Sequence, residues 1–405
     1  MLVWVTFGTT SSLARGRKEV ARLSTDDALW KLDVRALGYE APAVREWGPY
    51  VPLPPVGPLC FLAAGRIVVT FTTRTTPAAL SRREDIDTPS LPLRLHALFV
   101  DSKTGQLQTE QEWPTGSDRS RITRASSGFV VVTPERLALF SPEIMPLKEL
   151  VLSEREEAEL ASFRPQASPG AKFLLIRWEA RTGEQELYKL VNLSDLQVVM
   201  YWRSNLGGHV GAVSDNGMVT AGSWEEATKI GKPGNLTRSP CPSTDKHCLA
   251  GVFVSQDALF GVAPPHAPGT LHQEFSMHLK RTDGTIIFDQ ELPSGEVIEP
   301  IYPAVGGERF AVAVYRGKGG SRLLDIAPHF SLDRIIVYDL TSQRWIYSLQ
   351  GKNRGLKSIS ALALSPDGSL LALIDQEGRL EVYPIPATTL PAGTGGPGSR
   401  PGFGR

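Results

Sequence analysis

The sequence has little of the composition that marks nucleic-acid-binding, disulfide-rich or membrane-spanning proteins. Its 43 Lys and Arg are matched by 43 Asp and Glu, so no basic excess is available for nucleic acid or an anionic membrane surface. No uncharged apolar run approaches the roughly 18 residues that a membrane-spanning helix needs. With 405 residues, 41% of them hydrophobic, the chain is long enough for a sizeable core. We therefore expect a folded, monomeric protein with no nucleic-acid partner and no membrane span.

Cysteine is also scarce. Cys60, Cys241 and Cys248 are the only three, which is too few for a disulfide scaffold, and the last two supply only half of the ligands of a structural zinc. No metal site is therefore expected. Cys241 and Cys248 lie in a segment rich in Pro, Ser and Asp, where a disulfide between them would close a small surface loop in an oxidising compartment. Free thiols are the alternative. Cys60, with apolar neighbours on both sides, is expected to be buried.

Both ends of the chain differ from its middle. Residues 1–27 begin with a short apolar stretch and small residues at Ser12 and Ala14, which match a secretory signal in part, without its basic start. We expect an extracytoplasmic protein, periplasmic or secreted, with a cytoplasmic location as the alternative. Residues 387–405 are rich in Gly and Pro and are expected to form a disordered tail. The region between, 28–386, is expected to be one domain.

A short apolar strand, a Ser/Gly/Asp turn and a second apolar strand recur along this region. The clearest copy is S-A-L-A-L-S-P-D-G-S-L-L-A-L-I after Ile359, in which Pro, Asp and Gly occupy their preferred places in a β-turn. Six copies have a turn glycine and a seventh has Asp257 in its place; the glycines are Gly65, Gly128, Gly170, Gly217, Gly307 and Gly368. The copies recur about every 50 residues, which is the length of a propeller blade.

Two further strands follow in each repeat. They run from Leu93, Leu187, Phe275 and Ile335 with period-2 alternation and a turn between them, so each repeat has room for four antiparallel strands. This pattern resembles a WD-repeat-like β-propeller blade over roughly residues 58–386, with Tyr338-Asp339-Leu340 where that family often has a Trp-Asp pair. The predicted fold is an all-β, seven-bladed propeller; six or eight blades and a pair of β-sandwiches are the alternatives.

The last repeat has only three strands before Pro384 and Pro386. The N-terminal segment Ala28–Val34 is patterned as the missing fourth strand, and pairing it there would protect an open sheet edge. We therefore expect an N-terminal strand to close the ring.

Candidate chemistry is sparse. His266, His272 and His278 recur every six residues, but Pro268 and Gly269 interrupt any strand that could align them, which favours surface or loop histidines. No G-x-S-x-G nucleophile motif is present. The segment from Val100 to Trp113 resembles the tryptophan-docking segment of quinoprotein dehydrogenase propellers, in which a D-x-x-T-G turn precedes a strand that ends in Trp.

These observations predict a non-catalytic propeller that serves as a rigid binding or interaction platform for a protein or small ligand on one face. They predict no catalytic, cofactor-binding or metal-binding residues, and no cofactor. The alternative is an enzyme that uses the central channel, either quinoprotein dehydrogenase-like or a metal-dependent lactonase-like hydrolase. Two long interruptions, Thr72–Leu91 and Arg316–Leu332, are expected to be loops that project from one face and carry recognition.

Overall fold

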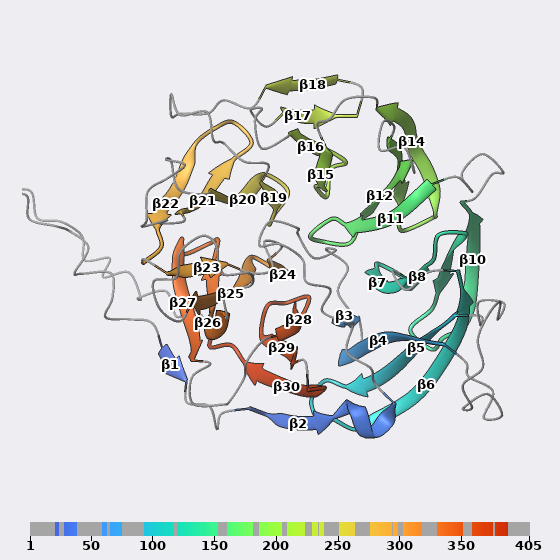
Figure 1. Cartoon of the computed structure of the whole chain (residues 1–405), viewed down its shortest axis with the longest axis horizontal. Coiled ribbons are helices and arrows are strands. Elements are labelled where there is room, and N and C mark those ends of the chain that lie inside the picture. Colours follow the sequence, from blue (N-terminus) through green and yellow to red (C-terminus); the bar gives the residue numbers. More distant parts are fainter. Residues whose placement is uncertain are drawn as a thin grey trace, which may run out of the picture.

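The computed structural model describes residues 21–23, 28–38, 59–62, 65–74, 93–116, 120–152, 160–180, 186–204, 209–222, 229–233, 235–238, 251–263, 276–293, 295–298, 303–317, 330–350, 359–375 and 377–387. The expected disulfide partners Cys241 and Cys248, the two terminal segments 1–20 and 388–405, and most of both long interruptions lie outside these residues. The described part forms seven sheets arranged in a ring, which is a seven-bladed β-propeller, as the repeat predicts (Figure 1).

Blades 1 to 3 follow one another along the chain, each with its strands in sequence order from the centre to the rim. Blade 1 contains β3 (Leu59–Leu62), β4 (Arg66–Arg74), β5 (Leu93–Asp101) and β6 (Leu107–Thr115). Blade 2 contains β7 (Arg121–Ala125), β8 (Gly128–Val132), β9 (Arg136–Phe140) and β10 (Pro146–Val151). Blade 3 contains β11 (Leu160–Ala167), β12 (Phe173–Ala180), β13 (Glu186–Asn192) and β14 (Gln197–Ser204).

Blades 4 and 5 repeat this order, and blades 6 and 7 depart from it. Blade 4 contains β15 (His209–Val213), β16 (Val219–Gly222), β17 (Lys229–Lys232) and β18 (Asn235–Arg238). Blade 5 contains β19 (Val252–Phe253), β20 (Ala258–Ala263), β21 (Ser276–Arg281) and β22 (Ile286–Glu291). Blade 6 has an inner strand in two pieces, β23 (Glu296–Ile298) and β24 (Ala304–Gly306), followed by β25 (Arg309–Gly317), β26 (Phe330–Asp339) and β27 (Arg344–Gln350). Blade 7 contains β28 (Ile359–Leu364), β29 (Leu370–Asp375) and β30 (Arg379–Pro384).

The seven predicted turns are the hairpins between the first and second strands of the seven blades. Gly217, Gly307 and Gly368 have φ values of 76°, 58° and 69°, in the left-handed region that glycine adopts without a steric penalty. In the copy without glycine, Ser255 accepts backbone hydrogen bonds from Asp257 and Ala258 instead. The repeat read from the sequence therefore marks the same structural position in every blade.

An N-terminal strand closes the ring, as expected. β2 (Trp30–Asp33) pairs antiparallel with β30 and becomes the fourth strand of blade 7. The pairing extends by one residue on each side, because the amides of Leu29 and Val34 donate to Val382 and Gly378. A single-turn 3-10 helix, η3 (Val34–Leu37), follows β2 and is the only helix among the described residues.

One strand was not predicted. β1 (Ala21–Leu23) pairs in parallel with β27 and adds a further strand to the rim of blade 6. The chain therefore crosses the rims of two neighbouring blades before it enters blade 1 (Figure 1). Nothing in the sequence A-R-L distinguishes these three residues from a loop, since a single short strand is decided by its partner.

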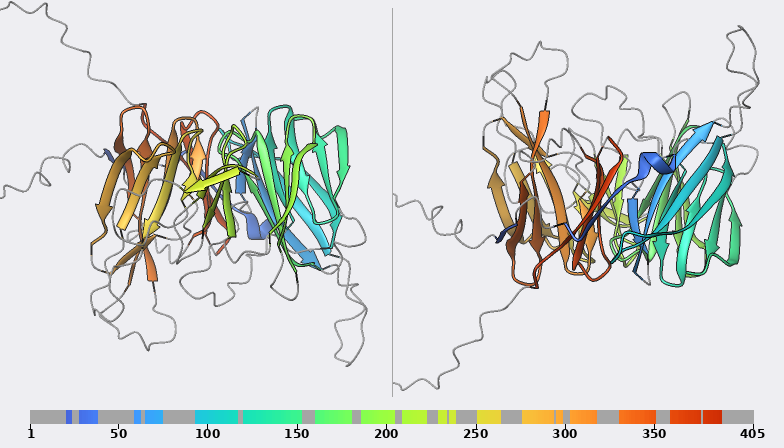
Figure 2. Two further views of the ribbon diagram at one scale, coloured as in Figure 1. Left: turned by 90° about the horizontal axis from the view of Figure 1, so that it is seen from above. Right: turned by 90° about the horizontal axis from the view of Figure 1, so that it is seen from below.

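Both predicted loops begin later than expected, and the second also ends earlier than expected. β4 continues through Arg74, β25 through Gly317, and β26 already begins at Phe330, so the outer parts of both predicted loops are strand. Each interruption joins the second and third strands of its blade, so the strand ends that flank both interruptions lie on the same face of the ring. Figure 2 shows the blades edge-on as a single ring of strands.

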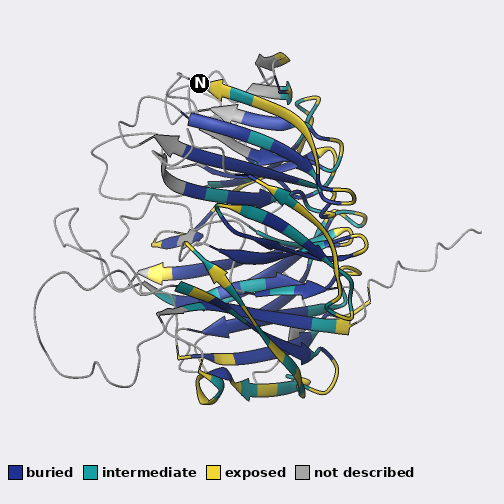
Figure 3. Ribbon diagram, turned by 90° about the vertical axis from the view of Figure 1, so that its right-hand side faces the viewer, coloured by how far each residue is buried: buried dark blue, intermediate teal, exposed yellow. Residues whose placement is uncertain are grey.

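The core consists of apolar clusters between neighbouring blades. Each of the seven interfaces has its own cluster, because alternate side chains of each strand face the two adjoining blades. The described cluster between blades 4 and 5 has the fewest buried members, Ala212, Phe253 and Leu259. Burial decreases toward the outermost strands (Figure 3).

Candidate functional site

The cysteine predicted to be buried lies in the first strand of blade 1. Cys60 on β3 is only partly buried and packs against the apolar cluster between blades 1 and 2. Burial nevertheless raises the pKa of its thiol to about 12, and the charge of Arg124 opposes this only in part. The thiol is therefore almost entirely protonated at neutral pH and is a poor nucleophile.

The histidine pattern is not a cluster among the described residues. His266 and His272 lie outside them, and His278 lies on β21 rather than in a surface loop, which corrects that expectation. Its Nε2 is buried without a hydrogen-bond partner, and burial, with the charge of Lys280, lowers the pKa of its imidazole to about 4. Gly261 on β20 leaves room for the ring, because a Cβ there would lie 2.4 Å from Nε2. His278 is thus a neutral side chain packed within blade 5.

The segment from Val100 to Trp113 contains the end of β5, the turn after it and most of β6. Asp101 accepts hydrogen bonds from the Thr104 amide and hydroxyl and from the Lys103 amide, which lowers the pKa of its carboxyl. Trp113 does not pack on this turn. The residue that does is Trp30 of the closing strand, whose indole donates to the Ser102 carbonyl at 2.9 Å and leaves no room for a Cβ at Gly105.

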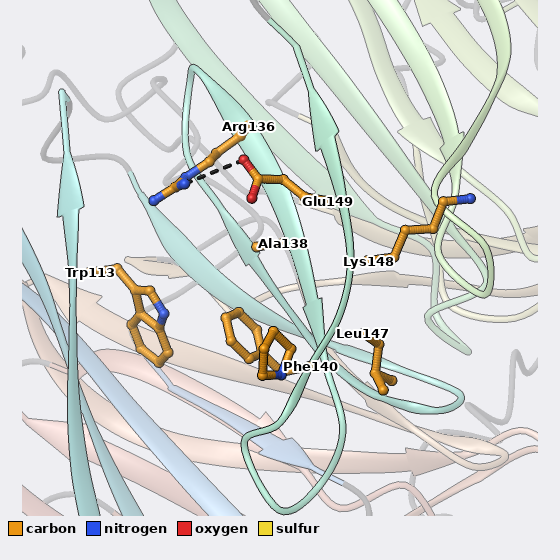
Figure 4. A pocket seen from close by; sticks show the side chains of 8 residues that line it. Trp113, Arg136, Ala138, Phe140, Leu147, Lys148 and Glu149 are labelled. Atoms are coloured by element: carbon orange, nitrogen blue, oxygen red, sulfur yellow. Dashed lines mark hydrogen bonds and ion pairs between the residues drawn. The ribbon is translucent and has the colours of Figure 1, made fainter.

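Trp113 instead points toward blade 2, where it lines an open cavity of about 280 Å³ between the rims of the two blades (Figure 4). Its ring lies 5.6 Å from that of Phe140, which stacks on Phe129 at 5.3 Å. Arg136 and Glu149 lie on the other side of the cavity and form an ion pair at 3.3 Å. The remaining lining residues are Ala138, Pro146, Leu147 and Lys148. The cavity therefore has an aromatic side and a side where opposite charges neutralise one another.

Apolar side chains extend from this cavity along the rim. Nine large hydrophobic side chains are exposed among the described residues, and seven of them lie on or next to the outermost strands of blades 2 and 3. We call these seven the rim patch: Met145, Leu147, Val151, Val198, Val199, Met200 and Tyr201. β10 and β14, the outermost strands of neighbouring blades, lie at the right of Figure 1, the side that Figure 3 turns toward the viewer. The other two, Leu29 and Ile286, are isolated on blades 7 and 5.

Polar contacts hold the two strands of the rim patch in place. The Lys148 ammonium donates to the Asp195 carbonyl in the turn before β14, and in Figure 4 this side chain points away from Trp113. The Lys189 ammonium donates to the Leu152 carbonyl at 2.6 Å and lies 5.7 Å from the ring of Tyr201. Two lysines thus join blades 2 and 3.

Sequence reasoning missed the rim patch. β14 was recognised as a strand, and its run Val198-Val199-Met200-Tyr201 departs from the alternation expected of a half-buried strand. That departure from alternation is the feature of the sequence that could have indicated the rim patch. The sequence could not show that the run lies on an outermost strand, where both sides are exposed.

Elsewhere, the described charged clusters are structural. Glu296 on β23 is 1% exposed and accepts hydrogen bonds from Arg316 and Arg334 at 2.6 and 2.7 Å. Burial alone would raise the pKa of its carboxyl, but these two guanidinium groups outweigh burial and lower it. The described residues contain no group of three His, Cys, Asp or Glu side chains arranged for a metal ion. They also contain no helix with the length and apolarity to cross a membrane.

Neither a protein-family model nor a curated protein sequence matches the chain. Several solved structures are similar in the path of the chain. One from the mitotic checkpoint complex and one of the Neurospora crassa Pan2 WD40 domain each have a TM-score of 0.46 and 10% identity, covering 89% of this chain and 96% of theirs. Oligogalacturonate lyase in complex with manganese has a TM-score of 0.45 and 11% identity, covering 73% of this chain and 86% of that one.

Proposed function

We propose that the protein is a non-catalytic platform that binds a protein partner through the rim patch and the cavity beside it. The observation that carries this proposal is the distribution of exposed apolar side chains, seven of nine on two neighbouring rims. Scattered surface hydrophobics are ordinary, whereas their concentration on one part of a folded protein favours an interaction surface. Trp113, Phe140 and Tyr201 also supply the aromatic side chains that protein interfaces favour.

The energetics suit a reversible complex. Each of the seven side chains is roughly half exposed, so covering one contributes about 1 kcal/mol, half of the value for a fully transferred side chain. The sum is about 7 kcal/mol, in the lower part of the roughly 4–15 kcal/mol that association costs. A partner must therefore gain further affinity in the cavity, where an apolar anchor would contact Trp113 and Phe140.

The test compares three immobilised forms of the full chain as bait for proteins of the native source: the wild type, the double variant Leu147→Asp with Val199→Asp, and the control Ile286→Asp. Ile286 is exposed to a similar extent but lies on blade 5. Each protein captured by the wild type is then purified and titrated against all three by calorimetry. We expect at least about tenfold weaker binding to the double variant, or about 1.4 kcal/mol, and unchanged binding to the control. Partners that bind all three equally would refute the proposal.

A further inference from the structure

The outermost strands share one irregularity. In blades 1, 2, 3, 5 and 6 the pairing between the third and fourth strands shifts by one residue near the start of the fourth strand. The extra residues are Gln108, Leu147, Val199, Ile287 and Ile346. Such a bulge bends the outer strand and re-aims the residues that follow it. The three residues after the bulge are therefore comparable from one blade to the next.

In blade 6 these three residues already hold an additional strand. β1 pairs in parallel with Tyr347, Ser348 and Leu349, immediately after the bulge at Ile346. All three are buried. The chain thus contains one example of strand addition at a rim, and it uses the first three regular residues after the bulge.

The corresponding residues of the other four blades differ in charge. Blade 1 has Thr109-Glu110-Gln111, blade 2 has Lys148-Glu149-Leu150, and blade 5 has Phe288-Asp289-Gln290. Charged side chains on an edge strand discourage the addition of another strand. Blade 3 has Met200-Tyr201-Trp202, which carries no charge, as in blade 6. Among these five blades, only the two charge-free edges lack this protection, and β1 covers one of them.

The uncovered edge is also exposed. Met200 and Tyr201 are 37% and 46% exposed, and β14 is uncharged from Gln197 through Trp202. Met200 and Trp202 share the side of Leu190 and Tyr188, toward blade 4, and the Trp202 and Tyr188 rings stack at 5.0 Å. Tyr201 shares the side of Lys189, toward blade 2. A strand laid along this edge would therefore contact apolar or aromatic surface on both of its sides.

We propose that the partner binds by adding a short extended segment to β14, parallel to it and paired with Met200, Tyr201 and Trp202. This inference rests on the proposed function, because it names how the rim patch is occupied. The occupant is a segment of another protein with apolar, β-branched or aromatic residues and without proline, since proline lacks the amide that the pairing needs. Main-chain hydrogen bonds would supply affinity, and the side chains that flank Tyr201 would supply selectivity.

The test uses peptides selected from a random 12-residue display library on the full chain. We expect selected peptides to lose at least tenfold affinity on Tyr201→Asp, which gives β14 the charge that Asp289 gives β22. The matched control Gln290→Asp, on β22, should bind them normally. In the complex, those backbone amides among Met200–Trp202 that point away from β13 should exchange more slowly with deuterium. N-methylation of every second peptide residue should abolish binding when the methylated amides face β14. The same modification of the intervening residues should leave binding unchanged, because only alternate amides of an added strand face β14.

The outcomes separate the two proposals. Strand addition would be refuted by peptides that lose affinity on Tyr201→Asp but tolerate N-methylation of either alternate set of residues and do not slow amide exchange. The rim patch would then remain the binding surface. Peptides that bind Tyr201→Asp as they bind the wild type would refute both. Light scattering that shows a wild-type dimer converted to monomer by Tyr201→Asp would identify a second copy as the occupant and would overturn the assignment to another protein.

Discussion

Closure of the ring can be tested at the contact between Trp30 and Gly105. Trp30 comes from the closing strand of blade 7, and Gly105 lies in the last turn of blade 1 with φ of 74°. An alanine Cβ at position 105 would lie 2.7 Å from two carbons of the indole. Gly105→Ala therefore combines a backbone penalty of about 1–2 kcal/mol for a left-handed alanine with displacement of the indole from its contact and from its hydrogen bond to Ser102.

The expected changes in the free energy of unfolding follow from the partial burial of Trp30. Trp30 is half-buried, so Trp30→Ala should lower the free energy of unfolding by about 2–3 kcal/mol, less than the roughly 3–5 kcal/mol of a fully buried aromatic residue. Gly105→Ala should lower it by about 3 kcal/mol in the wild type, but by only about 1 kcal/mol in the Trp30→Ala background, where the backbone penalty alone remains. The expected coupling energy is about 2 kcal/mol.

The assay is urea denaturation of the four proteins, followed by far-ultraviolet circular dichroism because tryptophan fluorescence changes with the substitution itself. Gly38→Ala is the matched control: Gly38 has φ of 85° and open space around it, so its penalty should be the same in both backgrounds. If the Trp30 and Gly105 substitutions add to within about 0.5 kcal/mol, the contact does not join blades 7 and 1, and the account of ring closure is wrong.

Three further predictions concern the termini, the thiols and His278. Deletion of residues 1–36 removes β1 and β2 and exposes the edges of β27 and β30, so the shortened chain should aggregate on size-exclusion chromatography. Deletion of residues 388–405 should leave elution and melting unchanged. Equal behaviour of the two shortened chains would contradict this prediction. We propose that the protein is exported and that Cys241 is bonded to Cys248, so that thiol titration finds a single free thiol, that of Cys60. At pH 8 this thiol should react only after denaturation, because its pKa is about 12. Three free thiols in protein isolated from its native compartment would instead indicate a reducing compartment. The pKa of His278 is lowered to about 4 in the folded protein, whereas the ordinary pKa of histidine, expected in the unfolded chain, is about 6.5. As pH falls below 6.5, the unfolded chain binds the proton first, so the free energy of unfolding should decrease by about 3 kcal/mol by pH 4. Above pH 6.5 the neutral imidazole makes its full contribution to stability. Urea denaturation of the wild type and His278→Leu across this range should therefore show the wild type losing about 3 kcal/mol relative to the variant toward low pH, and a constant difference between the two would count against a buried, neutral imidazole.

The sequence by itself determined the repeat. Alternating apolar residues on either side of a turn, with glycine at Gly217, Gly307 and Gly368, predicted a hairpin at the same place in each blade, because local turn chemistry and strand alternation depend on neighbouring residues alone. The missing fourth strand after Tyr383 and the apolar pattern near Trp30 likewise predicted how the ring closes. These inferences needed no knowledge of which side chains meet across blades.

Only the tertiary structure decided the candidate site. The run from Val198 to Tyr201 has the composition of a buried strand, and it is exposed because β14 has no fifth strand beside it and blade 4 covers one side only in part. Trp113 lies near the end of β6, whose sequence resembles a docking motif, yet its neighbours Phe129 and Phe140 come from the next blade. The pairing of β1 with β27 also joins residues more than 300 positions apart. Exposure and long-range pairing depend on which strands the closed ring brings together, and no local pattern of residues encodes them.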